Sequence, residues 1–73
     1  MLDELKGRGL VAPEGLWEVH LLCGHNGTLY VGIQTPGEGE PVILQALKES
    51  DFDNLLEIMK SALEPEIERV EYL

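Results

Sequence analysis

The chain has 73 residues, of which 14 are acidic and 5 are basic, so its formal net charge is −9. This length allows one domain, residues 1–73, and the charge excludes binding of nucleic acid through a basic face, which needs clustered lysine and arginine. The same shortage of basic residues argues against attachment to an anionic membrane surface.

Hydrophobic residues make up 44% of the chain and charged residues 26%, which is typical of a folded globular protein. A chain this short buries only a small core, and Cys23 is its one cysteine, so an intrachain disulfide cannot add stability. We therefore expect a homo-oligomer. The N-terminus does not resemble a signal peptide and no apolar run is long enough to span a membrane, so we expect a cytoplasmic protein.

The first fifteen residues predict a loosely ordered segment. Residues 2–6 can form a short helix, which Gly7 and Gly9 would end. Pro13 and Gly15 then favour a loop before the first strand.

Residues 16–34 predict two strands joined as a hairpin. In both runs apolar residues alternate with other residues, which is the period of a half-buried strand. The alternating apolar residues are Trp17, Val19, Leu21 and Cys23 in the first run and Leu29, Val31 and Ile33 in the second.

The same alternation indicates the length of the hairpin loop. A two-residue turn at Asn26-Gly27 would place the two apolar sets on opposite faces of the sheet, which is costly. A three-residue loop, residues 25–27 with Gly27 in the left-handed region, pairs Cys23 with Leu29 and places both sets on one face. We therefore predict the three-residue loop.

The next residues predict a loop at 35–41, which is rich in proline, glycine and glutamate. Residues 42–47 fit either a third strand or the beginning of the following helix. Ser50 is expected to cap that helix, with the carboxylate of Asp53 three residues further on.

An apolar stripe at helical spacing makes this helix the most clearly predicted element. The stripe consists of Phe52, Leu55, Leu56, Met59 and Leu63. Pro65 ends the helix, and residues 67–73 alternate again and predict a last strand.

The predicted order is β-β-β-α-β with an optional short N-terminal helix, which is an α+β fold. We expect a small antiparallel sheet of three to four strands with one main helix packed on one face. The hairpin register places His20, Leu22 and Tyr30 on the other face, with Leu22 opposite Tyr30. These three residues are the candidate interface, to be covered by a second subunit or by the N-terminal segment.

The grouping of His20, Cys23 and His25 raises the question of a zinc site. His20 and Cys23 point to opposite faces of a strand, and the sequence offers no second pair of ligands. We therefore expect no metal ligand and no cofactor-binding residue.

The sequence contains no recognisable catalytic motif. A Gly-x-Ser-x-Gly nucleophile elbow is missing, and Ser50 and Cys23 are assigned to a helix cap and to the core. The two Gly-x-Gly pieces, residues 7–9 and 37–39, do not join a strand to a helix as phosphate-binding loops do. We expect no catalytic residue and a protein that is not an enzyme.

The stretch from Trp17 to Ile33 resembles the opening hairpin of the GIY-YIG nucleases. Tyr30-Val31-Gly32 stands in the place of the second motif, and His20 lies near the position of the first motif's tyrosine. The family also requires a helix with a catalytic arginine and later a metal-binding glutamate, and neither can be placed here. The resemblance implies an alternative function, a degenerate GIY-YIG-like nucleic-acid enzyme.

The charge is divided unevenly along the chain. Residues 1–37 carry a net charge of −2 and residues 38–73 carry −7. The leading hypothesis is therefore a small acidic protein-interaction module, homo-oligomeric through the uncovered sheet face or an edge strand, with an acidic surface for a basic protein partner. A further alternative is an acidic mimic of DNA that inhibits a nucleic-acid-binding protein.

Overall fold

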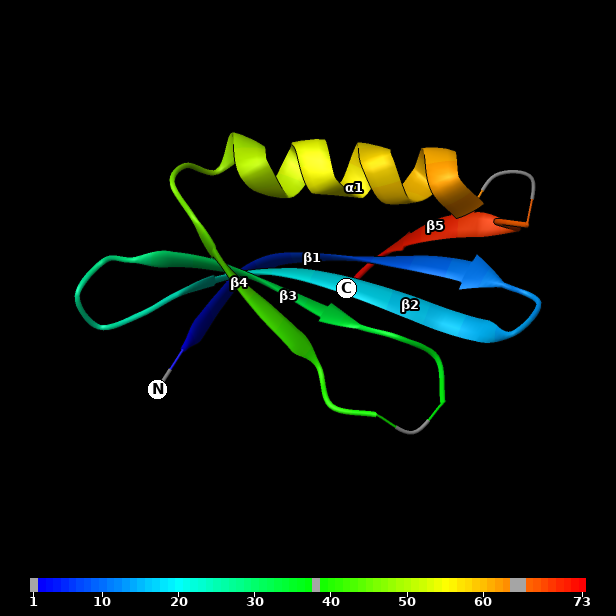
Figure 1. The fold of residues 1–73 in the computed structure, drawn as a ribbon, viewed down its shortest axis with the longest axis horizontal. Helices are drawn as coiled ribbons and strands as arrows, with labels where there is room; N and C mark the ends of the chain where they lie inside the picture. The colour runs from blue at the N-terminus through cyan, green and yellow to red at the C-terminus, as the bar shows by residue number, and fades with distance from the viewer. Residues whose placement is uncertain (1, 38, 64–65) are drawn as a thin grey trace.

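The computed structural model describes residues 2–37, 39–63 and 66–73. The elements in chain order are β1 (Asp3–Ala12), β2 (Gly15–Cys23), β3 (Leu29–Gln34), β4 (Val42–Ala46), α1 (Ser50–Leu63) and β5 (Arg69–Tyr72). The strands form an antiparallel sheet in the order β4-β3-β2-β1-β5, and α1 lies over one face of it (Figure 1). The predicted α+β class is confirmed, but the sheet has five strands rather than three to four.

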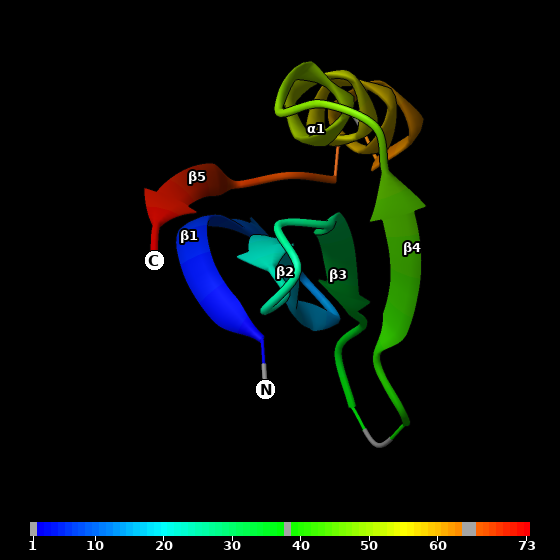
Figure 2. The same cartoon turned by 90° about the vertical axis from the view of Figure 1, so that its left-hand side faces the viewer.

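The topology is a four-stranded meander followed by one long crossing. β1 to β4 are sequential neighbours in the sheet. The chain then returns along α1 and reaches the far edge, where β5 pairs with β1, so β4 and β5 form the two edges (Figure 2). Within the described ranges, no helix has the length and apolar character needed to span a membrane.

The predicted short helix at residues 2–6 is wrong, because residues 3–12 of the segment expected to be loosely ordered form the strand β1. β1 is an inner strand, hydrogen-bonded to β2 on one side and to β5 on the other. Gly9, which was interpreted as a helix breaker, instead leaves room for a side chain of β2. A Cβ at this position would come within 2.7 Å of Leu16 Cδ1. Leu10 is completely buried, so this strand contributes directly to the core.

The predicted hairpin register between β2 and β3 is confirmed. Cys23 pairs with Leu29, and the N–H of Gly24 donates to the carbonyl of Thr28 at 2.8 Å, which leaves residues 25–27 as the loop. Gly27 has a φ of 83°, a conformation that favours glycine. Both apolar sets therefore lie on the same face.

Of the two alternatives for residues 42–47, the structure shows a strand, β4. The beginning of α1 differs from the expected cap at Ser50. The carboxylate of Asp51 accepts hydrogen bonds from the N–H groups of Leu47 at 2.7 Å and Lys48 at 3.2 Å. Asp51 in turn donates its own N–H to the carbonyl of Lys48 at 3.1 Å. Asp51, and not Ser50, thus supplies the side chain that stabilises this end.

The core lies between α1 and the middle of the sheet. Phe52 is fully buried, and it belongs with Leu56 to one buried cluster that also contains residues of the strands. The strand residues of this cluster are Leu10, Val19, Leu21, Val31 and Ala46. Lys6 borders the cluster, with its Nζ 5.0 Å from the centre of the Phe52 ring and 3.5 Å from the carboxylate of Asp53.

The central position of Phe52 gives a test of this core. Phe52→Ala should lower the free energy of unfolding by about 3–5 kcal/mol, because it removes a fully buried ring. The matched control is Ile58→Ala on the same helix, where the side chain is 64% exposed and the change should stay within about 0.5 kcal/mol. Urea denaturation measures both, and equal losses from the two variants would contradict the described packing.

Candidate functional site

The face of the sheet opposite α1, called the open face below, has no helix over it (Figure 1). Residues that pair directly in an antiparallel sheet share a face, and successive residues of a strand alternate between faces. The register therefore assigns the central side chains of the open face: Glu4, Glu18, His20, Leu22, Tyr30 and Ile43.

The structure places all three residues of the candidate interface on the open face. Leu22 pairs with Tyr30 and His20 pairs with Gly32, as the hairpin register predicted. His20 and Leu22 line a hollow of about 360 Å³, whereas Tyr30 lies outside it, next to Gly24. All three side chains are half-buried.

His20 lies between two carboxylates. Its Nδ1 is hydrogen-bonded to Oε1 of Glu4, and its Nε2 lies 3.2 Å from Oε1 of Glu18. A neutral imidazole has one N–H and can donate to only one of them, whereas an imidazolium donates to both. In either form, the two ionised carboxylates leave a net negative charge at the centre of the open face.

Two glycines make room for this arrangement. Gly7 in β1 and Gly32 in β3 flank His20 in the register. A Cβ at Gly7 would come within 2.9 Å of His20 Nδ1, and one at Gly32 would come within 3.2 Å of Ile43 Cδ1. The missing side chain of Gly7 thus leaves room for the imidazole ring, and that of Gly32 leaves room for the aliphatic side chains of Ile43 and Leu22 beside it.

The hollow combines negative charge with aliphatic walls. Leu22, Ile43 and Pro41 contribute apolar surface, and Glu4 and Glu18 contribute the charge. Among the described residues that line it there is no lysine or arginine. The site is therefore suited to a group that is both cationic and partly apolar.

Neither carboxylate of the site was predicted from the sequence. Glu18 is two residues from His20 on the same strand, so the period of two could have indicated it. Glu4 could be found only by recognising β1, since it reaches His20 from sixteen residues away in the chain. The glycines of β1, interpreted as breakers, concealed that strand.

The residues considered for zinc are not brought together. His20 lies on the open face, Cys23 pairs with Leu29 on the side of the helix, and His25 lies in the hairpin loop. No set of three or more His, Cys, Asp or Glu side chains in the described ranges is arranged to hold a metal ion. The half-buried Cys23 donates its thiol hydrogen to the carbonyl of Gly24, with Sγ at 3.4 Å from the oxygen.

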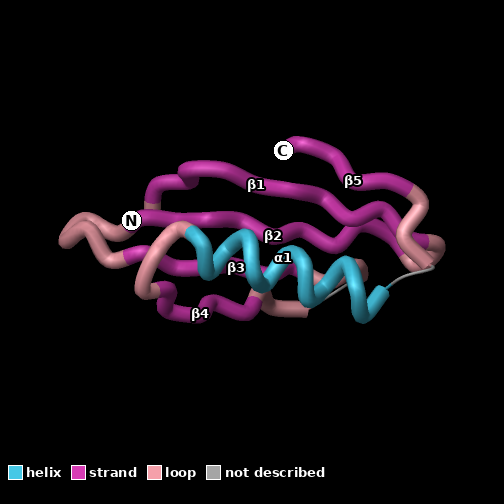
Figure 3. Tube along the Cα trace, turned by 90° about the horizontal axis from the view of Figure 1, so that it is seen from above, coloured by secondary structure: helices cyan, strands magenta, loops and turns pink. Residues whose placement is uncertain are grey.

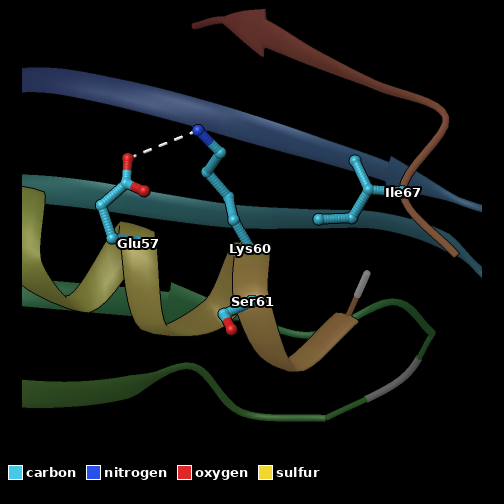
Figure 4. Close-up of a pocket in the computed structure, with 4 residues that line it drawn as sticks. All are labelled: Glu57, Lys60, Ser61 and Ile67. Atoms are coloured by element: carbon cyan, nitrogen blue, oxygen red, sulfur yellow. Dashed lines mark hydrogen bonds and ion pairs between the residues drawn. The ribbon is translucent and has the colours of Figure 1, made fainter. Parts of the chain in front are cut away.

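A second hollow of about 330 Å³ lies between the last turns of α1 and the segment before β5 (Figure 4). Glu57, Lys60, Ser61 and Ile67 line it. Glu57 and Lys60 form an ion pair at 3.4 Å, so their charges neutralise each other. This hollow therefore has little electrostatic preference for a charged ligand.

The two arginines of the chain lie away from Tyr30. Arg8, in β1, lies over the ring of Tyr72 with its Cζ 4.1 Å from the centroid, and Arg69, in β5, donates to Glu71 at 2.8 Å. Helix α1 contains no arginine. The nuclease-like alternative, which needs an arginine on a helix, gains no residue from this arrangement and stays a prediction.

Comparison of the chain with protein-family models, with curated proteins and with solved structures finds no match. The resemblance of residues 17–33 to the nuclease hairpin is therefore neither supported nor contradicted by relatives. The open face and the sheet edges therefore carry the chemistry that bears on function.

The close approach of Gly7 to His20 gives a test of the site. Gly7→Ala should displace the imidazole and lower the free energy of unfolding by about 1–3 kcal/mol, because the added Cβ overlaps the ring. The NMR signals of the His20 ring should shift in this variant. In the control Gly39→Ala, where the nearest atom to the new Cβ is 3.9 Å away, they should not. Unchanged His20 signals in Gly7→Ala would contradict the described geometry.

Proposed function

We propose that the protein is a small, acidic, non-enzymatic interaction module that binds a basic segment of a partner protein on its open face. The observation that supports this function is the hollow beside His20. There, two carboxylates and aliphatic side chains line one space, and no lysine or arginine is among the described lining residues.

The partner side chain in this proposal is an arginine or a lysine. Its charged end lies near Glu4 and Glu18, and its aliphatic stem lies along Leu22 and Ile43. Glu4 and Glu18 keep 48% and 35% of their side-chain surface exposed, so each ion pair contributes little alone. The net charge of −9 adds long-range attraction, which raises the association rate with a basic partner.

A second copy of the chain fits the open face less well than a basic partner. Packing two open faces together would bring Glu4 and Glu18 of both copies into one interface. Like charges at close range in an interface cost free energy. Within this proposal the homo-oligomer expected from the sequence therefore uses an edge of the sheet and leaves the open face to another protein.

The cytoplasmic location expected from the sequence is also part of this proposal. Its support is the single Cys23, which suits a compartment that keeps thiols reduced.

Titration with a basic peptide tests the proposed function. The probe is a short peptide of alternating arginine and leucine, added to the ¹⁵N-labelled protein. We expect chemical-shift changes at Glu4, Glu18, His20 and Leu22, because these residues border the hollow. The double variant Glu4→Gln, Glu18→Gln should weaken binding about tenfold, since it removes two charges that contact the peptide.

The control variant removes the same number of charges elsewhere. Glu49→Gln with Glu57→Gln changes two exposed acids on the side of α1 and should leave the affinity for the peptide within about twofold. Equal weakening by both double variants would show non-specific attraction and contradict the proposal. Shift changes confined to the acids of α1 would favour the DNA mimic. Cleavage of nucleic acid with magnesium or manganese that depends on His20 and Tyr30 would favour the nuclease-like alternative.

A further inference from the structure

The two edges of the sheet differ in chemistry. β5 carries a charged pair, Arg69 and Glu71, and charged side chains on an edge oppose pairing with another strand. β4 has no charged residue, and Val42, Ile43 and Leu44 are 50%, 46% and 45% exposed. β4 is therefore the edge at which another strand can be added.

The position of α1 leaves the outer side of β4 accessible. Seen from above, the helix runs over the inner strands, and β4 lies outside it (Figure 3). From the end of the sheet, β4 is the outermost strand on its side (Figure 2). Nothing in the described part of the chain pairs with the outer edge of β4.

The hydrogen-bonding pattern identifies the free backbone groups of this edge. In an antiparallel ladder, residues alternate between bonding to one neighbour strand and to the other. The bond between Gly24 and Thr28 shows that the backbone groups of Thr28 point toward β2, so along β3 those of Val31 point toward β4. Leu44 pairs with Val31, so the backbone groups of Leu44 point toward β3. The N–H and C=O groups of Ile43 and Gln45 therefore point away from the sheet.

We propose that β4 pairs antiparallel with β4 of a second copy, about a two-fold axis through Leu44. Leu44 is the middle residue of β4, so this register overlaps the two strands completely. The axis is perpendicular to the sheet, which keeps both helices on the same side and produces one continuous sheet. The interface uses the same residues on both copies.

This register satisfies the outward backbone groups. Ile43 lies opposite the partner's Gln45, so the N–H of each donates to the C=O of the other. Leu44 packs against the partner's Leu44 on the side of the helix, and Val42 packs against the partner's Ala46. The exposed side chains of Val42 and Leu44 are thereby covered by apolar groups, and Ile43 packs beside the partner's Gln45 on the open face.

Neighbouring registers satisfy fewer groups. Centring the axis on Ile43 places Pro41, which has no N–H, opposite the partner's Gln45. Centring it on Gln45 places Ile43 opposite the partner's Leu47, whose N–H already donates to Asp51. Registers shifted by a single residue would pair side chains from opposite faces.

The charges that flank β4 match the same register. Glu40 precedes β4 by two residues and Lys48 follows it by two, so the register brings Glu40 to the same end of the paired strands as the partner's Lys48, and the two-fold axis repeats this pair on the other side. In the described part of the chain neither Glu40 nor Lys48 forms an ion pair, whereas Lys6, Lys60 and Arg69 each do. Opposite charges at both ends of an uncharged strand favour a second copy of the chain as the occupant of this edge.

The most exposed apolar side chain fits the same arrangement. Leu47 follows β4 directly and is 89% exposed in the single chain. The register brings it to the end of the paired strands at which the partner's Pro41 precedes β4. Pairing of the two strands therefore covers apolar surface on both faces of the sheet.

Sedimentation of the full chain with charge-swapped variants tests this register. We expect a reversible dimer of the unmodified chain at concentrations up to about 1 mM. Glu40→Lys and Lys48→Glu should each weaken it about tenfold, because each puts like charges opposite one another. The double variant should restore the affinity, since the charges are opposite again. The control Asp3→Lys makes the same charge change outside β4 and should not weaken the dimer.

A backbone variant tests the strand pairing separately. Ile43→Pro removes an N–H that points outward, so it should keep the β3–β4 pairing and weaken the dimer at least about tenfold. Circular dichroism verifies that the variant is folded. A monomer at about 1 mM, a dimer unaffected by a folded Ile43→Pro variant, or a double swap that fails to restore affinity would each overturn the proposal. Ile43 lines the hollow beside His20, whereas Glu40 and Lys48 do not, so the charge-swap result is the one that is independent of the peptide titration.

Discussion

The sheet has five strands, and a single helix has to cover it. A helix of 14 residues is about 21 Å long and about 10 Å wide, whereas five strands about 4.8 Å apart span roughly 20 Å. The helix can therefore bury about half the width of one face. Complete burial is accordingly restricted to α1 and the inner strands, at Phe52, Leu10, Val19 and Leu21. Every other surface of the sheet has to be stable in water or covered by another molecule.

The same constraint accounts for the composition of the open face. A second apolar layer would have no helix to cover it, so the centre of this face carries an imidazole between two carboxylates and is lined with glycines. Gly7 leaves room for the His20 ring, whose two nitrogens lie beside Glu4 and Glu18, and Gly32 leaves room for the side chains of Ile43 and Leu22. The result is a face that is polar at its centre and aliphatic at one side, which is the chemistry on which the proposed binding of a basic segment depends.

Patterns that are strictly local could be predicted from the sequence. The alternation in residues 16–34 indicated the hairpin, and the cost of splitting its apolar residues between two faces indicated the loop that brings Cys23 opposite Leu29. That register also placed His20, Leu22 and Tyr30 on one face. The helical stripe around Phe52 likewise matches α1.

The N-terminal strand could not be predicted in the same way. Gly7 and Gly9 weaken any local preference for a strand, and their role appears only when His20 and Leu16 lie across them. Because β1 was missed, Glu4, one of the two carboxylates beside His20, was missed with it. The residue that caps α1 could not be predicted either. Ser50 and Asp51 are both suitable capping residues, and the local sequence does not indicate that Asp51 makes the hydrogen bonds.

The distribution of the acidic charge over the sheet edges affects where two copies of the chain can approach each other. A net charge of −9 separates copies of a small protein, because most approaches bring carboxylates together. The run from Pro41 to Leu47 is free of charge and is flanked by Glu40 on one side and Lys48 on the other. In the proposed dimer, antiparallel approach of two copies at this edge brings opposite charges together, whereas the edge at β5 carries the charged side chains of Arg69 and Glu71. Repulsion over the rest of the surface thus disfavours other contacts and leaves β4 as the edge at which two copies can meet.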